Sequence, residues 1–180
     1  MTNWHNRFLE LATHISSWSK DPSTKVGAVI TRGNRIISTG FNGPPQKVHD
    51  LQERFLDREM KLKMTLHAEI NAILFAKQDL KGCTLYCTHP PCTQCAAMII
   101  QSGLEEVIFP PLPSFAEAPK FYERWKTDID LSMKLFSEAN IIVSERWWKN
   151  SSNVLLAMEN SHSVISPNVI PKNAKNAAMK

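Results

Sequence analysis

All four cysteines of this chain lie within 13 positions, and this cluster restricts the fold more than any other feature of the sequence. Two of them form the segment Cys92-Thr93-Gln94-Cys95, which follows Pro91, a residue that favours the first turn of a helix. Both sulfurs then lie on one face of the helix, whose N-terminus favours the thiolate form. In a reducing compartment such a cluster indicates metal binding or redox chemistry before disulfides.

A third metal ligand is available at His67, in the segment His67-Ala68-Glu69. Two thiolates and one imidazole give zinc three protein ligands, whereas a structural site normally has four and a catalytic site keeps one position for water. Glu69 points about 200° away from His67 on a regular helix, so it is not expected to bind the same metal. From the helix entry it can instead reach the water or the substrate and move a proton between them. His-x-Glu followed by Pro-Cys-x-x-Cys is the signature of zinc-dependent nucleobase deaminases.

Simpler interpretations of these residues are also open. His67 could be a helix-cap histidine, with the two cysteines of the helix start as a thiol redox pair. Cys83 and Cys87 alternate on a predicted strand, which favours small core residues over additional ligands. His89 is expected to pack in a loop rather than to complete a four-ligand site.

The hydrophobic pattern alternates between strand-like and helix-like segments. Helices are predicted at 3–18, 67–77, 92–102 and about 120–138, and strands at 26–31, 35–41, 83–88, 106–109 and 141–144. This order predicts an α/β protein, a three-layer α/β/α sandwich around a five-stranded mixed sheet. The charged residues 46–66 are expected to form an amphipathic helix or a half-ordered loop.

One domain is expected over residues 1–150, with 151–180 as a tail or late packing segment, because serine and asparagine dilute the pattern there. The chain lacks a run of 18 apolar residues and the features of a signal peptide, which predicts a cytoplasmic protein that does not span a membrane. Its net charge of +4 is dispersed. Such a charge does not indicate a nucleic-acid-binding stripe, although it suits a small anionic ligand.

Several further segments make the sequence resemble the cytidine deaminase superfamily, and within it the deoxycytidylate (dCMP) deaminases. They are 25–30 (KVGAVI), 40–43 (GFNG), 67–73 (HAEINAI), 84–86 (TLY), 100–103 (IQSG) and 106–108 (EVI). The resemblance covers about residues 5–145. The metal pattern is shared by the whole superfamily, whereas Asn-Gly at 42–43 and Asn-Ala-Ile at 71–73 point to the dCMP branch.

The resemblance implies a cytidine deaminase-like fold and hydrolytic deamination of dCMP to dUMP and ammonia, which supplies dUMP for dTTP synthesis. It implies that His67, Cys92 and Cys95 hold a catalytic Zn²⁺ and that Glu69 shuttles the proton. The backbone at Ala68 would help to hold the pyrimidine. It also implies a homohexamer that dCTP activates and dTTP inhibits, with Mg²⁺ on the triphosphate.

Contacts to the rest of the substrate follow less directly from the resemblance. Asn42 matches the family position that holds the deoxyribose hydroxyl; the alternative is a turn asparagine in the left-handed conformation. For the phosphate we expect Ser23 and Lys25 before the first strand, together with Tyr122 and Arg124. The alternative for the last two is a solvated helix start.

An effector site is expected at the charged segment 46–66 and the loop before it. Its candidate residues are Asn42, Gly43, His49, Arg54, Arg58, Lys61 and Lys63. The alternative is an exposed helix with surface ion pairs. Some family members bind a second zinc through this segment, but here it offers only His49, so one zinc per chain is predicted.

Two other functions remain open. A related deaminase could act on tRNA, single-stranded DNA or a free nucleoside, and strand binding would require exposed aromatic and basic residues. Trp147 and Trp148 with their basic neighbours are the candidate cluster for such binding, although packing is the expected role. A zinc-stabilised scaffold without catalysis is the second alternative, against which Glu69 argues.

Overall fold

The computed structural model describes residues 3–49, 51–111 and 119–146, except for the side chains of Gln52 and Tyr122. A five-stranded mixed sheet in the order β2-β1-β3-β4-β5 forms its centre. The strands are β1 (Gly27–Arg32), β2 (Arg35–Phe41), β3 (Thr84–Cys87), β4 (Glu106–Phe109) and β5 (Ile142–Glu145). β1 pairs antiparallel with β2 and with β3, whereas β3, β4 and β5 run parallel.

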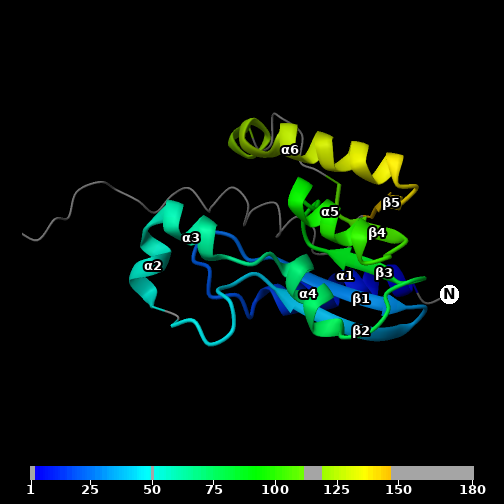
Figure 1. Cartoon of the computed structure of the whole chain (residues 1–180), viewed down its shortest axis with the longest axis horizontal. Coiled ribbons are helices and arrows are strands. Elements are labelled where there is room, and N and C mark those ends of the chain that lie inside the picture. The colour runs from blue at the N-terminus through cyan, green and yellow to red at the C-terminus, as the bar shows by residue number, and fades with distance from the viewer. Residues whose placement is uncertain (1–2, 50, 112–118, 147–180) are drawn as a thin grey trace, which may run out of the picture.

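Helices cover both faces of this sheet (Figure 1). They are α1 (Trp4–Ser16), α2 (Gln52–Leu56), α3 (Arg58–Met64), α4 (Ala68–Ala76), α5 (Thr93–Gln101) and α6 (Pro119–Glu138). Alternation along β1 explains the layers, because Val29 packs with α1 while Ala28 and Ile30 pack with α4 and α5. Phe136 of α6 packs in the same core as α4 and α5. The predicted three-layer α/β/α sandwich is therefore confirmed.

The charged segment 46–66 contains two short helices, α2 and α3, which lie beside the sheet (left in Figure 1). Asp57 separates them and caps α3, because its side chain accepts a hydrogen bond from the Met60 N–H at 3.0 Å. Part of this segment is therefore helical, as one of the two interpretations predicted. The first helix ends at Ser16, two residues earlier than predicted.

The expected tail at 151–180 and the Trp147–Trp148 cluster lie outside the described residues, so both stay predictions. No helix among residues 3–49, 51–111 and 119–146 is both long and apolar enough to cross a membrane.

Gly40 on β2 allows α4 to lie directly against the sheet. A methyl group at this position would collide with backbone atoms of Ala68 and Ala72. α4 begins with the segment that includes Glu69, so this contact helps to set the position of that side chain. Only glycine permits such a close approach of helix and strand.

We predict that Gly40→Ala lowers the thermal unfolding midpoint by about 2–10 °C, since overpacking of this kind costs about 1–3 kcal/mol. Circular dichroism during heating measures the shift. Gly43→Ala is the matched control, because a methyl group there meets only the Phe41 ring at 4.0 Å. A Gly40→Ala protein that melts with the wild type would show that α4 can move away from β2 without cost.

Candidate active site

Two helix starts bring three metal-ligating side chains together. His67 is the extended residue that precedes α4, Cys92 holds the same place before α5, and Cys95 lies in the first turn of α5. The Nδ1 atom of His67 is 3.4 Å from the Cys92 sulfur and 3.3 Å from the Cys95 sulfur. Donor atoms around one tetrahedral zinc ion are about 3.5 Å apart, so this donor set fits zinc.

The three side chains of this group influence one another's protonation. A hydrogen bond from Cys95 lowers the pKa of the Cys92 thiol to about 4, and the His67 ring adds to the effect. The same contact with Cys92 raises the pKa of His67 to about 9, against the opposing effect of burial. The lowered pKa favours the thiolate of Cys92, the form of cysteine that binds zinc, whereas the contact with Cys92 and burial raise the pKa of the Cys95 thiol.

Glu69 lies beside this group, on the first turn of α4. Its side chain is only 3% exposed, and burial raises the pKa of its carboxyl group while the nearby His67 lowers it. A buried carboxyl group with a raised pKa can hold a proton and release it near neutral pH. It is not one of the three clustered donors, in agreement with the helix geometry expected from the sequence.

Glu69, His67 and Cys92 border a cavity of about 380 Å³. This volume lies in the range of small-molecule sites, about 300–1,000 Å³. Polar side chains in the wall include Asp21, Ser23, Thr24, Asn42, Arg58, Lys61 and Arg124, and the aromatic ones are Phe55, Phe121 and Trp125. The cavity therefore combines the possible metal centre, a proton carrier and several cations.

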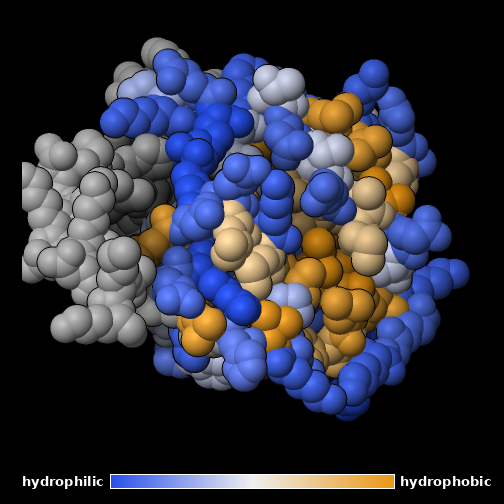
Figure 2. Space-filling view, turned by 60° about the vertical axis from the view of Figure 1, so that its left-hand side comes forward, coloured by the Kyte–Doolittle hydropathy of each residue, from blue (hydrophilic) through white to orange (hydrophobic). Residues whose placement is uncertain are grey.

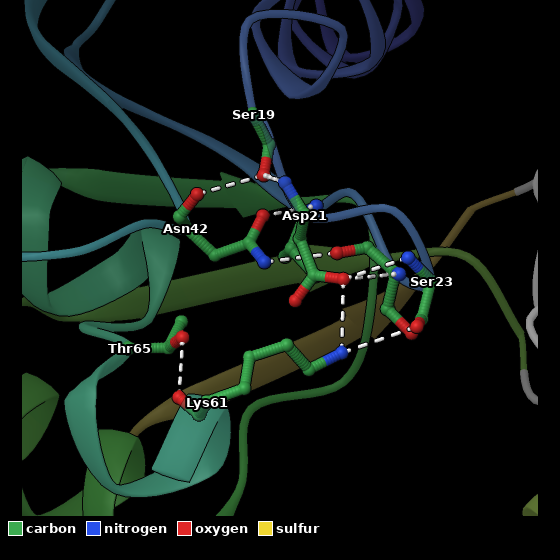
Figure 3. Close-up of polar contacts among 8 residues, drawn as sticks. Ser19, Asp21, Ser23, Asn42, Lys61 and Thr65 are labelled. Carbon is green, nitrogen blue, oxygen red and sulfur yellow. Dashed lines mark hydrogen bonds and ion pairs between the residues drawn. The ribbon is translucent and has the colours of Figure 1, made fainter. Parts of the chain in front are cut away.

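The wall next to β1 is held by a network of hydrogen bonds centred on Asp21 (Figure 3). One oxygen of its carboxylate accepts from the N–H groups of Ser23 and Thr24, at 2.7 and 3.0 Å, and from the ammonium group of Lys61 at 3.0 Å. Lys61 also donates to the Ser23 hydroxyl at 3.1 Å. The ion pair is buried, so α3 is tied to the loop that precedes β1.

Asn42 supports the same loop from the end of β2. Its amide oxygen accepts from the Val26 N–H at 2.8 Å, and its amide nitrogen donates to the Thr24 carbonyl at 2.9 Å. The backbone of Asn42 is not in the left-handed region, so the alternative of a left-handed turn asparagine is wrong. Asn42 is buried and borders the cavity while it supports this loop.

Only some of the other expected substrate residues border the cavity. Arg124 on α6 borders the cavity, and burial together with the charge of Arg58 lowers the pKa of its guanidinium group. Lys25 is exposed and is not part of the cavity wall, and Ala68 is fully buried. Tyr122 lies on α6, but its side chain is outside the described residues.

The expected effector residues do not form one cluster. Arg58 and Lys61 belong to the wall of the main cavity, and Lys61 is buried instead of solvated. His49 and Arg54 border, with Lys61, a second hollow of about 10 Å³, which is about the size of one water molecule. Lys63 pairs with Glu59 on the surface, and Gly43 forms a β-bridge with Leu66.

Sequence reasoning missed Asp21, although Asp-Pro-Ser is a typical signal for a side chain that hydrogen-bonds the following backbone N–H groups. Phe121 and Trp125 had no distinguishing signal, because aromatic residues on a helix usually belong to the core. His89 borders the cavity, and burial lowers the pKa of its ring to about 4. It is not in the metal donor group, and the buried Cys83 and Cys87 are confirmed as core residues.

The mixed sheet, the His/Cys/Cys donor set and the adjacent buried carboxyl group define a zinc-dependent nucleobase deaminase centre. The model of the cytidine and deoxycytidylate deaminase zinc-binding region matches residues 2–110. The chain belongs to this family.

Individual relatives agree with this assignment. An uncharacterized deaminase encoded in the luxG 3' region of Aliivibrio fischeri is 49% identical over 144 residues, which are 80% of this chain and 94% of that protein. The mouse deoxycytidylate deaminase is 39% identical over 115 residues, or 59% of this chain and 64% of the enzyme. The human enzyme matches to the same extent.

A solved structure shows the same fold. The dCMP deaminase from the cyanophage S-TIM5, in complex with dCMP and dUMP, superposes with a TM-score of 0.60 at 24% identity. The match covers 78% of this chain and 94% of the phage protein. The expected resemblance to dCMP deaminases, the cytidine deaminase-like fold and the assignment as a hydrolytic deaminase are confirmed.

Proposed function

We propose that this protein converts dCMP to dUMP and ammonia by hydrolysis and so supplies dUMP for dTTP synthesis. One observation supports this most directly: the buried carboxyl group of Glu69 and two of the three clustered donors, His67 and Cys92, share a cavity with three cationic side chains. The deoxycytidylate deaminases among its relatives support the same substrate.

His67, Cys92 and Cys95 would hold one zinc ion per chain. When bound, zinc lowers the pKa of a coordinated water toward about 7 and supplies a nucleophile at neutral pH. Because the three protein donors leave a tetrahedral ion one ligand short, the centre suits catalysis better than a purely structural role.

Glu69 would carry the proton. Its carboxylate accepts a proton from the attacking water and delivers it to N3 of the pyrimidine while the oxygen adds to C4. The same carboxylate then takes the proton of the hydroxyl now on C4 and passes it to the exocyclic amine, after which the C4–N bond breaks, the C4 carbonyl forms and ammonia leaves. Burial of Glu69 suits this role, since it raises the pKa of the carboxyl group toward the working pH.

The outer groups of the nucleotide would meet the remaining cavity wall. Arg58, Lys61 and Arg124 outnumber the adjacent Asp21, which leaves an excess of positive charge for the 5'-phosphate. Ser23 adds a hydroxyl group. Asn42 would use its second amide hydrogen for the deoxyribose hydroxyl. These cations favour a nucleotide over a free nucleoside, which has no phosphate to bind.

We predict that Glu69→Gln lowers kcat for dCMP about a thousandfold or more, because the amide cannot carry the proton. Ammonia release measures activity, and metal analysis of the same sample is expected to find about one zinc per chain. Turnover of dCMP by this variant at the wild-type rate would exclude Glu69 as the proton carrier. Failure of the wild type to deaminate dCMP while it acts on deoxycytidine, tRNA or single-stranded DNA would overturn the proposed substrate.

We predict that Arg124→Ala and Arg58→Ala each raise KM for dCMP about tenfold or more and leave deoxycytidine kinetics nearly unchanged, since each removes a charge-assisted contact. Lys134→Ala is the control, because Lys134 is an exposed cation on the same helix. Equal effects of a variant on nucleotide and nucleoside would exclude that arginine as a phosphate contact.

We further infer from the resemblance a homohexamer regulated by dCTP and dTTP with Mg²⁺. The buried pair of Lys61 and Asp21 supports a connection between effector binding at α3 and the active site, because a shift of α3 would move the cavity wall. The second hollow is too small for a triphosphate in one chain, so a neighbouring subunit would have to complete the effector site. Leu74 and Phe75 on α4 are about half exposed, at 54% and 47%, which favours an oligomer. Figure 2 shows apolar side chains gathered on one face of the molecule, beside a polar band.

We predict that light scattering finds a particle of about six chains and that Leu74→Glu reduces its mass. In the ammonia assay with Mg²⁺, dCTP is expected to increase and dTTP to decrease the turnover of dCMP. Ala97, also exposed but on α5, provides a control as Ala97→Glu. A monomer that ignores both triphosphates would remove the regulatory proposal and leave the deaminase proposal in place.

A further inference from the structure

α6 lies across the start of α5, the helix whose N-cap and first turn provide two of the three metal donors (Figure 1). Three of its side chains follow one another at intervals of four residues, so they share one face of the helix: Arg124, Asp128 and Ser132. The first borders the cavity, whereas the other two contact the segment around Cys92. The last two have no part in the mechanism described above.

Asp128 caps α5 from outside that helix. Its carboxylate accepts the Thr93 N–H at 3.1 Å and the Thr93 hydroxyl at 2.6 Å. Cys92, the residue in the N-cap position, forms no capping bond with its side chain, and its sulfur is 3.4 Å from the His67 ring. A residue at this position would normally satisfy the first N–H groups itself, so α6 replaces a cap that a metal ligand cannot supply.

Ser132 holds the other side of the same residue. Its fully buried hydroxyl donates to the carbonyl of Pro91 at 2.8 Å. The carbonyl before Cys92 and the N–H after it are therefore both held by α6, through two residues that are one helical turn apart. These contacts fix the backbone on both sides of Cys92, and with it the place of its Cβ atom relative to His67.

We propose that Asp128 and Ser132 are positioning residues of the metal centre, which hold the turn from Pro91 to Thr93 so that the Cys92 sulfur stays at binding distance from His67. Metal sites require their ligands to be held within about 0.5 Å, and residues behind the ligands supply this precision.

The test measures the release of zinc from the loaded full-length protein to a coloured chelator, without nucleotide. We expect Asp128→Ala to release zinc about tenfold faster than the wild type, at the lower end of the effect of removing a group behind a ligand. Asp128→Asn keeps an acceptor oxygen and is expected to restore most of the retention. Asp130→Ala, on the exposed side of α6, is the matched control and is expected to match the wild type.

A double-mutant cycle separates positioning from general loss of stability. Thr93→Val removes the hydroxyl that donates both to the carboxylate and to the main-chain carbonyl of Asp128, so Asp128→Ala combined with Thr93→Val is expected to speed zinc release by less than the two single effects together. Ile129→Val, at a buried position on the same helix, reports the effect of a weakened core. The absorption spectrum of the cobalt-loaded protein is expected to change in Asp128→Ala and not in Ile129→Val.

Wild-type zinc release by Asp128→Ala would overturn the proposal, and so would independent, additive effects of the two substitutions in the cycle. Equal release rates in Asp128→Ala and Ile129→Val, with unchanged cobalt spectra, would assign the effect to stability alone. Because no nucleotide is present, none of these outcomes depends on whether dCMP is the substrate.

Discussion

The meeting of the N-termini of α4 and α5 is the contact on which the rest of the site depends. The sheet register explains it, because Ala28 on β1 pairs with Gly40 on one side and with Cys87 on the other. α4 rests on Gly40, and α5 begins a few residues after Cys87, so both helices start at the same end of β2 and β3, the two strands that flank β1. Helix N-termini favour negative charge, and here they share a thiolate and a carboxyl group.

The cavity has a different origin from the metal donors, since its wall comes from segments that do not belong to the sheet. The loop before β1, helix α3 and helix α6 each contribute one part of it. The buried pair of Lys61 and Asp21 joins the first two, and loss of either partner of such a pair typically costs about 3–5 kcal/mol. α3 is thus both a part of the main cavity wall, through Arg58 and Lys61, and an exposed helix with the surface ion pair of Lys63 and Glu59.

The order of strands and helices was predictable because period-two and helical patterns are local properties of the chain. The candidate donors His67, Cys92 and Cys95 and the carboxyl group of Glu69 were predictable for the same reason, since motif spacing and helix geometry relate them. The burial of Lys61 could not be predicted. A lysine on a short charged segment is expected to be exposed to solvent unless its partner is known, and Asp21 is 40 residues away. The contacts of α6 with the start of α5 escaped sequence reasoning in the same way, because they join residues 35 and 41 positions apart.

The buried ion pair also bears on how the molecule assembles. β1 and β2 lie between Asp21 and Lys61 in the sequence. Neither charged side chain can be buried until that hairpin has formed and α3 has packed against the loop before it. Closing a loop of this length costs entropy that only later contacts offset. The pair can therefore be buried only with the hairpin in place, and the cavity wall at α3 is expected to open before the sheet does.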